Sequence, residues 1–280
     1  MRAAVLGSPI GHSLSPALHR AAYAHLGLDW QYEAIECDEQ ALPALLDRLG
    51  PDWAGLSLTM PLKAAVLPLL GEVDPVAARA GAANTVVLRD GLRMGFNTDV
   101  PGMVAALTER YVTPAGPAAV LGGGATARSA VLSLAMAGWT EITVLARRPV
   151  TLDWERSALP EGVFEAGVRL GTTDLSRGQV AAAMRSDLVV STLPKGVADQ
   201  FTAEVLKGLG TLFDVVYDPW PTPLATSWAL HGGAVLSGLD LLVHQAALQV
   251  VLMTGTTAPV SDLVAVMRKA GQAAMAARPG

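Results

Sequence analysis

Short apolar runs alternate with helix-like segments along the chain. The apolar run Ala3–Gly7 predicts a buried strand, and Ser15–Leu26 is predicted to be a helix. Ser15 suits the N-cap of this helix and Gly27 its end, with Pro16 at the first helical position. The other elements expected in this part are strands at Tyr32–Ile35 and Gly55–Leu58, a helix at Pro61–Leu70, and a hairpin of Asn84–Leu88 and Arg93–Phe96 around Asp90-Gly91. The N-terminal part is therefore predicted to be a mixed α/β unit with at least one antiparallel strand pair.

A second series of elements begins near Pro117 and has the spacing of a βαβ unit. It comprises a strand at Ala118–Leu121, a turn at Gly122–Gly124, a helix at Ala125–Ala137 and a strand at Glu141–Leu145. Further strands are predicted at Asp187–Ser191 and Thr211–Val216, and helices over residues 239–280. The weakly patterned stretch Arg148–Thr173 is expected to form an irregular helix and loops. This part of the chain is predicted to contain a parallel sheet.

Size, charge and cysteine content narrow the class of protein. The chain has 280 residues, of which 51% are apolar and 16% charged, and a formal net charge of -5. This length suits two domains, and the acidic balance gives no basic surface for nucleic acid or an anionic membrane. The single cysteine, Cys37, excludes an intrachain disulfide and is interpreted as a buried apolar residue. The histidines are scattered without metal-ligand spacing, so no metal site is expected.

The hydropathy pattern predicts no transmembrane helix, because no stretch of about 18 residues is free of polar or helix-breaking residues. The opening run MRAAVLGSPIGHSLSP is expected to form a strand and a loop rather than a signal peptide. We therefore expect a cytoplasmic protein with no membrane and no nucleic-acid partner. The sequence leaves the oligomeric state open, a homodimer included.

The run LGGGATARSA follows a predicted strand and opens a predicted helix. A pyrophosphate must approach bare backbone N–H groups at a helix N-terminus, and Gly122–Gly124 leave room for that approach. Ala125 and Ala127 are small enough for the helix to lie close to the strand. By itself, the run is equally compatible with a plain tight turn.

The next predicted strand ends in Leu145-Ala146-Arg147-Arg148. NAD-binding proteins usually place an acidic residue there, about 20 residues after the glycine turn. No acid is present, and a guanidinium matches a 2′-phosphate both in charge and in geometry. A solvated surface pair would explain the same two arginines. With the glycine turn at the right distance, the pattern favours NADP over NAD.

Polar islands interrupt the apolar N-terminal part at Ser13-Leu14-Ser15, Thr59–Lys63, Ala83-Asn84-Thr85 and Asn97-Thr98-Asp99, and a fifth lies at Val243–Ala247. Taken singly, most are explained by helix capping or turn formation. Lys63 is different, because it is predicted in the first turn of a helix, where the dipole disfavours a cation. This unusual position makes Lys63 a candidate for proton transfer.

Together these runs resemble the shikimate dehydrogenase family, whose members reduce 3-dehydroshikimate to shikimate in chorismate and aromatic amino acid biosynthesis. The resemblance spans nearly the whole chain, and the order and spacing of the runs match. The matching runs are GSPIGHSLSPALH, LTMPLK, GAANTV, GFNTDVPG, GGGATAR, DVVYDPWPTPL and GLDLLVHQAA. The resemblance implies a mixed-sheet substrate domain over residues 1–102, a Rossmann-like NADP-binding domain over 103–238, and C-terminal helices over 239–280 that return to the first domain.

The resemblance also implies residue roles. Lys63 and Asp99 would form the catalytic pair, with Lys63 transferring the proton during hydride transfer at C3. The implied substrate contacts are Ser13, Ser15, Thr59, Asn84, Asp99, Tyr217 and Gln245. The implied NADP(H) contacts are Gly122, Gly123, Gly124, Ala125, Thr126 and Ala127 at the pyrophosphate, Arg147 and Arg148 at the 2′-phosphate, and Thr192, Val215 and Gly238 along the rest of the cofactor.

The sequence departs from the family pattern at several positions. Ser57 stands where many members have Asn, Ala146-Arg147-Arg148 where many have Asn-Arg-Thr, and Leu241 where a Met is common. Two other functions fit the same features: a quinate or aminoshikimate dehydrogenase of the same superfamily, and a catalytically silent NADP(H)-binding sensor. Ser15 favours shikimate, because quinate-type members often carry Thr at that position. The presence of both Lys63 and Asp99 argues against a sensor.

Overall fold

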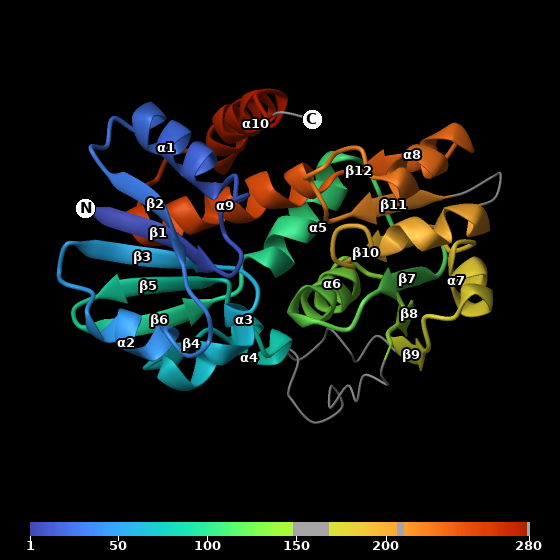
Figure 1. The fold of residues 1–280 in the computed structure, drawn as a ribbon, viewed down its shortest axis with the longest axis horizontal. Helices are drawn as coiled ribbons and strands as arrows, with labels where there is room; N and C mark the ends of the chain where they lie inside the picture. Colours follow the sequence, from blue (N-terminus) through green and yellow to red (C-terminus); the bar gives the residue numbers. More distant parts are fainter. Residues whose placement is uncertain (148–167, 206–209, 279–280) are drawn as a thin grey trace. The chain divides into compact units, whose positions relative to one another are not determined.

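The computed structural model describes residues 1–147, 168–205 and 210–278 (Figure 1). The chain divides into two compact units, Met1–Gly102 with Leu242–Gly280, and Met103–Leu241. The helices α5 (Asp99–Glu109) and α9 (Gly238–Thr254) contain the two points where the chain passes from one unit to the other. The α/β fold class predicted from the pattern is confirmed.

The first unit is built on a mixed sheet of six described strands in the order β2-β1-β3-β5-β6-β4. The strands are β1 (Arg2–Gly7), β2 (Gln31–Glu36), β3 (Trp53–Leu58), β4 (Glu72–Val73), β5 (Thr85–Arg89) and β6 (Leu92–Phe96). β1 pairs in parallel with β2 and β3, whereas β5 is antiparallel to β3 and β6. Every residue of β3 is buried, the polar Ser57 included, because the strand lies at the centre of the sheet.

Helices cover this sheet and complete the apolar core. They are α1 (Ser15–His25), α2 (Leu42–Asp47), α3 (Leu62–Ala65), α4 (Pro75–Ala80), the 3-10 turn η1 (Leu67–Leu69), part of α9, and α10 (Val260–Ala276). α1 packs against α10, which the chain reaches only at its C-terminal end (Figure 1). A core cluster of Leu6, Leu42 and Leu56 with their neighbours joins β1, α2 and β3.

Local details of the first unit correct two expectations. The helix predicted over residues 61–70 is broken into α3 and η1, because Pro68 has no N–H to donate to the turn before it. Ser15 is not an N-cap: α1 begins at Ser15 itself, and the Ser13 hydroxyl accepts a hydrogen bond from Ser15 N at 3.3 Å. The hairpin is confirmed, with positive φ angles of 52° and 77° at Asp90 and Gly91.

The second unit contains a parallel sheet whose described strands follow the order β12-β11-β10-β7-β8-β9. They are β7 (Ala118–Leu121), β8 (Glu141–Leu145), β9 (Arg169–Thr173), β10 (Leu188–Ser191), β11 (Thr211–Asp214) and β12 (Ala234–Leu236). Between them lie α6 (Ala125–Met136), α7 (Arg177–Ala183), the 3-10 helix η3 (Ala198–Glu204) and α8 (Pro223–Leu230). This is the strand order of a doubly wound dinucleotide-binding sheet.

Two edge strands of this sheet were not expected. The end of the stretch predicted as irregular helix and loops, Arg169–Thr173, forms β9 and pairs with β8. Its residues are exposed or half-buried, so it lacks the apolar run of a central strand. β12 has only three residues, too few to show a period. The strand predicted to reach Val216 ends at Asp214. The rest of the irregular stretch, residues 148–167, lies outside the described residues.

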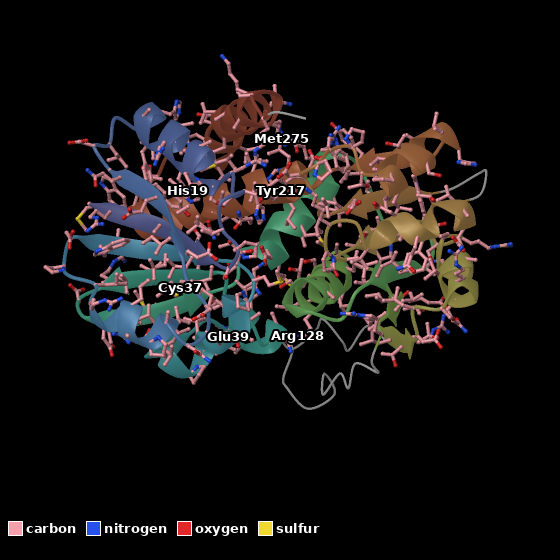
Figure 2. All side chains as sticks on the ribbon, in the orientation of Figure 1. His19, Cys37, Glu39, Arg128, Tyr217 and Met275 are labelled. Atoms are coloured by element: carbon pink, nitrogen blue, oxygen red, sulfur yellow. The ribbon has the colours of Figure 1, made fainter. Side chains whose placement is uncertain are left out.

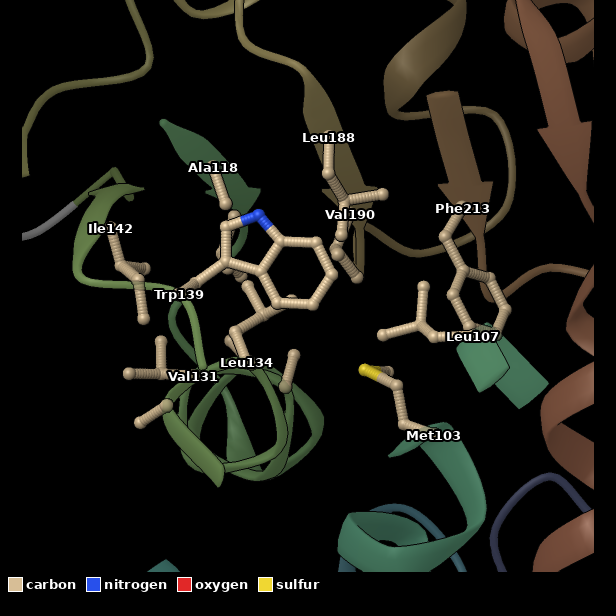
Figure 3. Packing of buried hydrophobic residues seen from close by; sticks show 14 of the residues in the cluster. Met103, Leu107, Ala118, Val131, Leu134, Trp139, Ile142, Leu188, Val190 and Phe213 are labelled. Atoms are coloured by element: carbon tan, nitrogen blue, oxygen red, sulfur yellow. The ribbon is translucent and has the colours of Figure 1, made fainter. Parts of the chain in front are cut away.

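Apolar side chains cover both faces of the parallel sheet. Trp139 is buried in the cluster on one face (Figure 3), and Trp228 is buried in the cluster on the other. Successive side chains of a strand point to opposite faces, so β7 contributes to both clusters. Ala118 and Val120 belong to the first cluster, and Ala119 and Leu121 to the second. Among the described residues, no helix combines the length and apolar character needed to cross a bilayer.

His19 and Cys37 are buried in the first unit and are labelled in Figure 2. Cys37 is a buried free thiol, as predicted. His19 is fully buried on α1 and stacks on Tyr32, with ring centroids 3.9 Å apart and an interplanar angle of 14°. Its Nδ1 lies 2.9 Å from Ser15 O. Burial lowers the pKa of His19 from 6.5 to about 4, so the ring is neutral at neutral pH.

We expect His19→Phe to reduce the acid sensitivity of the fold while preserving the ring stack. Between pH 6.5 and about 4 the unfolded chain binds a proton at His19 that the folded protein does not, so falling pH favours unfolding. The effect amounts to about 3 kcal/mol at its full extent. Urea unfolding of both proteins at pH 7 and pH 4.5 measures it. Equal losses in the two proteins would contradict the prediction.

Candidate active site

A lysine–aspartate pair lies at one edge of the first unit's sheet. Lys63 Nζ is 2.6 Å from Asp99 Oδ2, and the two side chains are only 14% and 7% exposed. Lys63 stands in α3, and Asp99 is the first residue of α5. The predicted helical position of Lys63 is confirmed, but α3 has only four residues, so few peptide dipoles are aligned there. The Asp99 carboxylate is therefore the dominant charge beside the amine.

Asn84 fixes the other side of this carboxylate. Its Nδ2 donates to Asp99 Oδ1 at 2.9 Å and lies 3.2 Å from Gln245 Oε1. Its Oδ1 accepts a hydrogen bond from Thr98 N at 2.8 Å. The two carboxylate oxygens of Asp99 thus have different partners, Lys63 and Asn84, and the plane of the group is fixed. Asn84 is itself 1% exposed, so these bonds are made away from solvent.

The strand register explains why segments far apart in sequence meet here. Leu6 pairs with Leu58, so the ends of β1 and β3 lie at one edge of the sheet. Ser57 pairs with Thr85, and Thr85 pairs with Phe96, so the start of β5 and the end of β6 lie at the same edge. The residues that follow or precede these strands are the predicted polar islands, which carry Ser13, Ser15, Thr59, Asn84 and Asp99. The fold brings all four N-terminal islands to this edge.

Gln245 reaches the same group of side chains from α9. Its Nε2 donates to Leu242 O at 3.0 Å, which leaves its Oε1 directed at Asn84. A side chain at Gly102 would lie only 2.9 Å from Gln245 N, so this glycine permits the close approach of the two backbones. Ser15 is buried, whereas Ser13 and Thr59 are partly exposed.

The sequence reasoning missed several residues of this site. Thr98 and Thr85 belong to the quoted motifs, but no role was expected for them. The Thr98 hydroxyl lies 3.2 Å from Asn84 Oδ1, and the Thr85 hydroxyl lies 2.9 Å from the same atom. Gln249 is also bonded to this group of residues. It follows Gln245 by four residues, so a repeated glutamine on one helix face was the available signal.

The predicted dinucleotide site lies in the second unit. Gly122 N donates to Leu145 O at 2.8 Å, and the backbone of Gly122 has a φ of 121°. α6 begins directly after Gly124, which provides no side-chain cap. Gly123 and Gly124 are exposed, so the first N–H groups of a twelve-residue helix are open to an anion. These residues fit a pyrophosphate group.

The neighbouring strands support the same site. The strand order reverses at β7 and β10, where doubly wound sheets bind their ligands. Thr192 follows β10, and its hydroxyl donates to Leu121 O at 2.9 Å. A side chain at Gly238 would collide with Val215 O. Arg147 is exposed just after β8, and Arg148 lies outside the described residues.

Asp214 holds the loop that carries Val215 and Tyr217. Its carboxylate accepts hydrogen bonds from Thr222 Oγ1 at 2.7 Å and from Val216 N at 3.2 Å. Burial raises the pKa of this carboxyl. Tyr217 belongs to the second unit and is partly buried, and its predicted substrate contact stays a prediction.

The fold and the site define a two-unit α/β protein with a dinucleotide-binding sheet and a separate polar site. Residues 5–86 match the model of the shikimate dehydrogenase substrate binding domain, and residues 238–270 match the shikimate 5'-dehydrogenase C-terminal domain. The shikimate dehydrogenase (NADP(+)) of Moorella thermoacetica is 37% identical over 276 residues, which is 95% of this chain and 92% of that protein. The chain belongs to the shikimate dehydrogenase family.

Solved structures agree with this assignment. Shikimate dehydrogenase from Mycobacterium tuberculosis is 40% identical, with a TM-score of 0.82 over 96% of this chain and 99% of that one. Shikimate 5-dehydrogenase from Thermus thermophilus, solved in complex with NADP(H) and shikimate, is 34% identical, with a TM-score of 0.79 and the same coverage.

We expect Gly122→Ala to destabilise the second unit by about 1–3 kcal/mol, because a side chain is strained at this φ and would collide with Thr192 Oγ1. Thermal unfolding followed by circular dichroism measures the loss. Gly178→Ala is the matched control, since a methyl group there meets nothing within 4 Å. Equal melting temperatures for the Gly122 variant and the wild type would refute this account of the turn.

Proposed function

We propose that this protein is an NADP-dependent shikimate dehydrogenase, which reversibly reduces 3-dehydroshikimate to shikimate in chorismate and aromatic amino acid biosynthesis. The observation that carries the proposal is the Lys63–Asp99 pair at 2.6 Å, held by Asn84 and little exposed to solvent. Relatives named for this activity cover nearly the whole chain, which supports the substrate and cofactor.

The residues at the sheet edge supply the contacts that a hydroxylated ring carboxylate needs. Ser13 and Ser15 hold the carboxylate through their hydroxyl groups, and the hydrogen bond from Ser15 N to Ser13 Oγ supports their proximity. Thr59, Asn84 and Gln245 hydrogen-bond the ring hydroxyls. Asp99 accepts a hydrogen bond from a further hydroxyl, and Tyr217 is a further substrate contact in this proposal. A site built from such buried polar groups rejects analogues that leave them unpaired.

Lys63 transfers the proton. NADP(H), when bound, supplies or accepts the hydride at C3. During reduction the ketone oxygen gains negative charge, and Lys63 Nζ donates the proton that neutralises it; during oxidation Lys63 takes that proton back. Asp99 Oδ2 orients the amine, and Asn84 keeps the carboxylate from rotating.

The second unit holds the cofactor. Gly122, Gly123 and Gly124, with Ala125, Thr126 and Ala127, receive the pyrophosphate at the start of α6. Arg147, with Arg148 beside it in sequence, pairs with the 2′-phosphate that distinguishes NADP from NAD. Thr192, Val215 and Gly238 line the rest of the cofactor.

We also propose a cytoplasmic location and a homodimer, which cell fractionation and analytical ultracentrifugation test.

The absorbance of reduced nicotinamide, followed with shikimate and NADP⁺ or NAD⁺ in parallel cuvettes, tests the function. Fast reduction of NADP⁺ alone supports it. Turnover only with quinate or an amino analogue would keep the mechanism and change the substrate. Ser15 argues against this alternative substrate. Tight NADPH binding without turnover of any ring acid would instead indicate a sensor.

Lys63→Ala is expected to lower kcat by about 10²–10⁴-fold and to leave the KM for shikimate nearly unchanged, because the proton donor acts in the transition state. Steady-state kinetics in both directions measure this. Lys269→Ala, an exposed lysine on α10, is the control and keeps wild-type kcat. A Lys63→Ala enzyme that turns over at the wild-type rate would remove Lys63 from the mechanism.

Arg147→Ala is expected to raise the KM for NADPH about tenfold, because one charge-assisted contact to the 2′-phosphate is lost. The KM for shikimate stays constant, and discrimination against NADH falls. Arg185→Ala removes another exposed arginine of the second unit and controls for net charge. An unchanged KM for NADPH would show that Arg147 does not bind the 2′-phosphate.

A further inference from the structure

A chain of hydrogen bonds runs beneath the proposed substrate site, through residues to which the proposed mechanism gives no role. Tyr32 OH donates to Ser57 Oγ at 2.7 Å, and Ser57 Oγ donates to Gln249 Oε1 at 2.7 Å. Gln249 Nε2 then donates to Thr85 Oγ1 at 3.0 Å and to Asn84 O at 3.1 Å. None of these side chains is more than 3% exposed. We call Tyr32, Ser57, Thr85 and Gln249 the Gln249 network.

Gln249 lies at the centre of this network because both ends of its amide are engaged. Its oxygen accepts from Ser57, and its two N–H groups match the two acceptors, Thr85 Oγ1 and Asn84 O. The bonds join α9 to β3 and β5, and the residues that they connect are 164 to 192 positions apart in sequence. Removal of the amide would take one hydrogen bond from each of three buried groups, Ser57 Oγ, Thr85 Oγ1 and Asn84 O.

The network ends on Asn84, the residue that orients Asp99. Gln249 contacts Asn84 at its main-chain oxygen, and Thr85 Oγ1 donates to Asn84 Oδ1 at 2.9 Å. Asn84 is therefore held at its backbone and at its side chain by the same group of residues. Its Nδ2 then bonds Asp99 Oδ1, whose partner oxygen bonds Lys63. A shift of Asn84 would be transmitted to both members of the pair.

The Ser57 hydroxyl makes its hydrogen bonds within this network. Its hydroxyl proton is directed to Gln249, and one of its lone pairs accepts from Tyr32. Burial raises the pKa of Tyr32 well above its ordinary value, so Tyr32 stays a donor at any working pH. A Ser57 hydroxyl engaged in this way has no proton left to donate to a substrate oxygen.

We propose that Gln249 is a positioning residue for the reaction: it contacts neither reacting group, and it sets the geometry of the Lys63–Asp99 pair through Asn84 and Thr85. The inference rests on the proposed function. A purely structural role for Gln249 would affect only the stability of the fold, so the two roles separate in the kinetics.

Gln249→Met keeps the length of the side chain and removes its hydrogen bonds. We expect kcat for shikimate oxidation to fall by about 10- to 100-fold, because small misplacements of catalytic groups reduce rates to this extent. The pH profile of kcat should change as well, whereas the KM for NADP⁺ should stay within about twofold because the proposed cofactor residues belong to the second unit. Steady-state kinetics across pH, with thermal unfolding of each variant, measure these effects.

Val250→Ala provides the matched control. Val250 is the next residue of α9, fully buried and apolar, so its truncation lowers stability without removing a hydrogen bond. Its kcat and pH profile should equal those of the wild type at a temperature where both variants are folded. A Gln249→Met protein that matches Val250→Ala, with lower stability and unchanged kcat, would overturn the proposal.

Thr85→Val is a second, smaller change. It removes the hydroxyl link between Gln249 and the Asn84 side chain and leaves the bond to Asn84 O, so kcat should fall less than in Gln249→Met, and Thr85→Ser should restore it. If Gln249→Met does not fold, Thr85→Val decides the question, and a wild-type kcat of the Thr85→Val protein rejects the inference.

If the wild-type enzyme oxidises quinate and not shikimate, the proposed substrate fails while the same variants test the inference with quinate. A wild type that oxidises no ring acid rejects both.

Discussion

A lysine ammonium and an aspartate carboxylate, 2.6 Å apart and largely removed from water, impose the main constraint on the first unit. Charges in such a place lose hydration, and the pair is tolerated only where the remaining lone pairs and protons also find partners. Asn84 provides such a partner for the second oxygen of Asp99. Asn84 in turn must be held, and the bonds from Thr98, Thr85 and Gln249 hold it. Much of the buried polar structure at this edge follows from one ion pair.

The first unit has a mixed sheet and the second unit a parallel sheet, and the two sheets gather different kinds of groups at their edges. A mixed sheet lets antiparallel β5 and β6 begin and end at the edge where parallel β1 and β3 end, which gathers side chains from four segments. A parallel sheet does not bring strand starts and strand ends together, but it directs its strand ends and the N-terminus of α6 to one edge. The first arrangement suits specific side-chain contacts, and the second suits backbone contacts to an anion.

The helices that contain the two chain crossings also carry site residues. Asp99 begins α5, and Gln245 lies in α9, together with Gln249. In both helices these residues lie on the side of the crossing that belongs to the first unit. Gln245 and Gln249 lie on one face of α9. Gln245 contacts the side chain of Asn84, and Gln249 contacts its main-chain oxygen.

Sequence patterns with a local physical cause predicted the corresponding elements well. The apolar runs of β1, β3 and β7, the Asp90-Gly91 hairpin and the glycine turn before α6 depend on neighbouring residues and on backbone conformations that few residue types adopt. The motifs also located Lys63, Asn84, Asp99 and Gln245, whose mutual bonds the structure supplies. Edge strands were missed, since β9 has little buried surface and β12 is too short to show a pattern.

The sequence by itself thus determined the fold class, the central strands of both sheets and the residue types of the candidate site. Only the tertiary structure decided how Ser57 is used, that the Ser13 hydroxyl accepts from Ser15 N at the start of α1, and that Gln249 supports Asn84. The bonds of Gln249 join residues 164, 165 and 192 positions apart. No local preference encodes such a contact, because it exists only when the packing of β3, β5 and α9 brings the groups together and removes the water that would otherwise satisfy them.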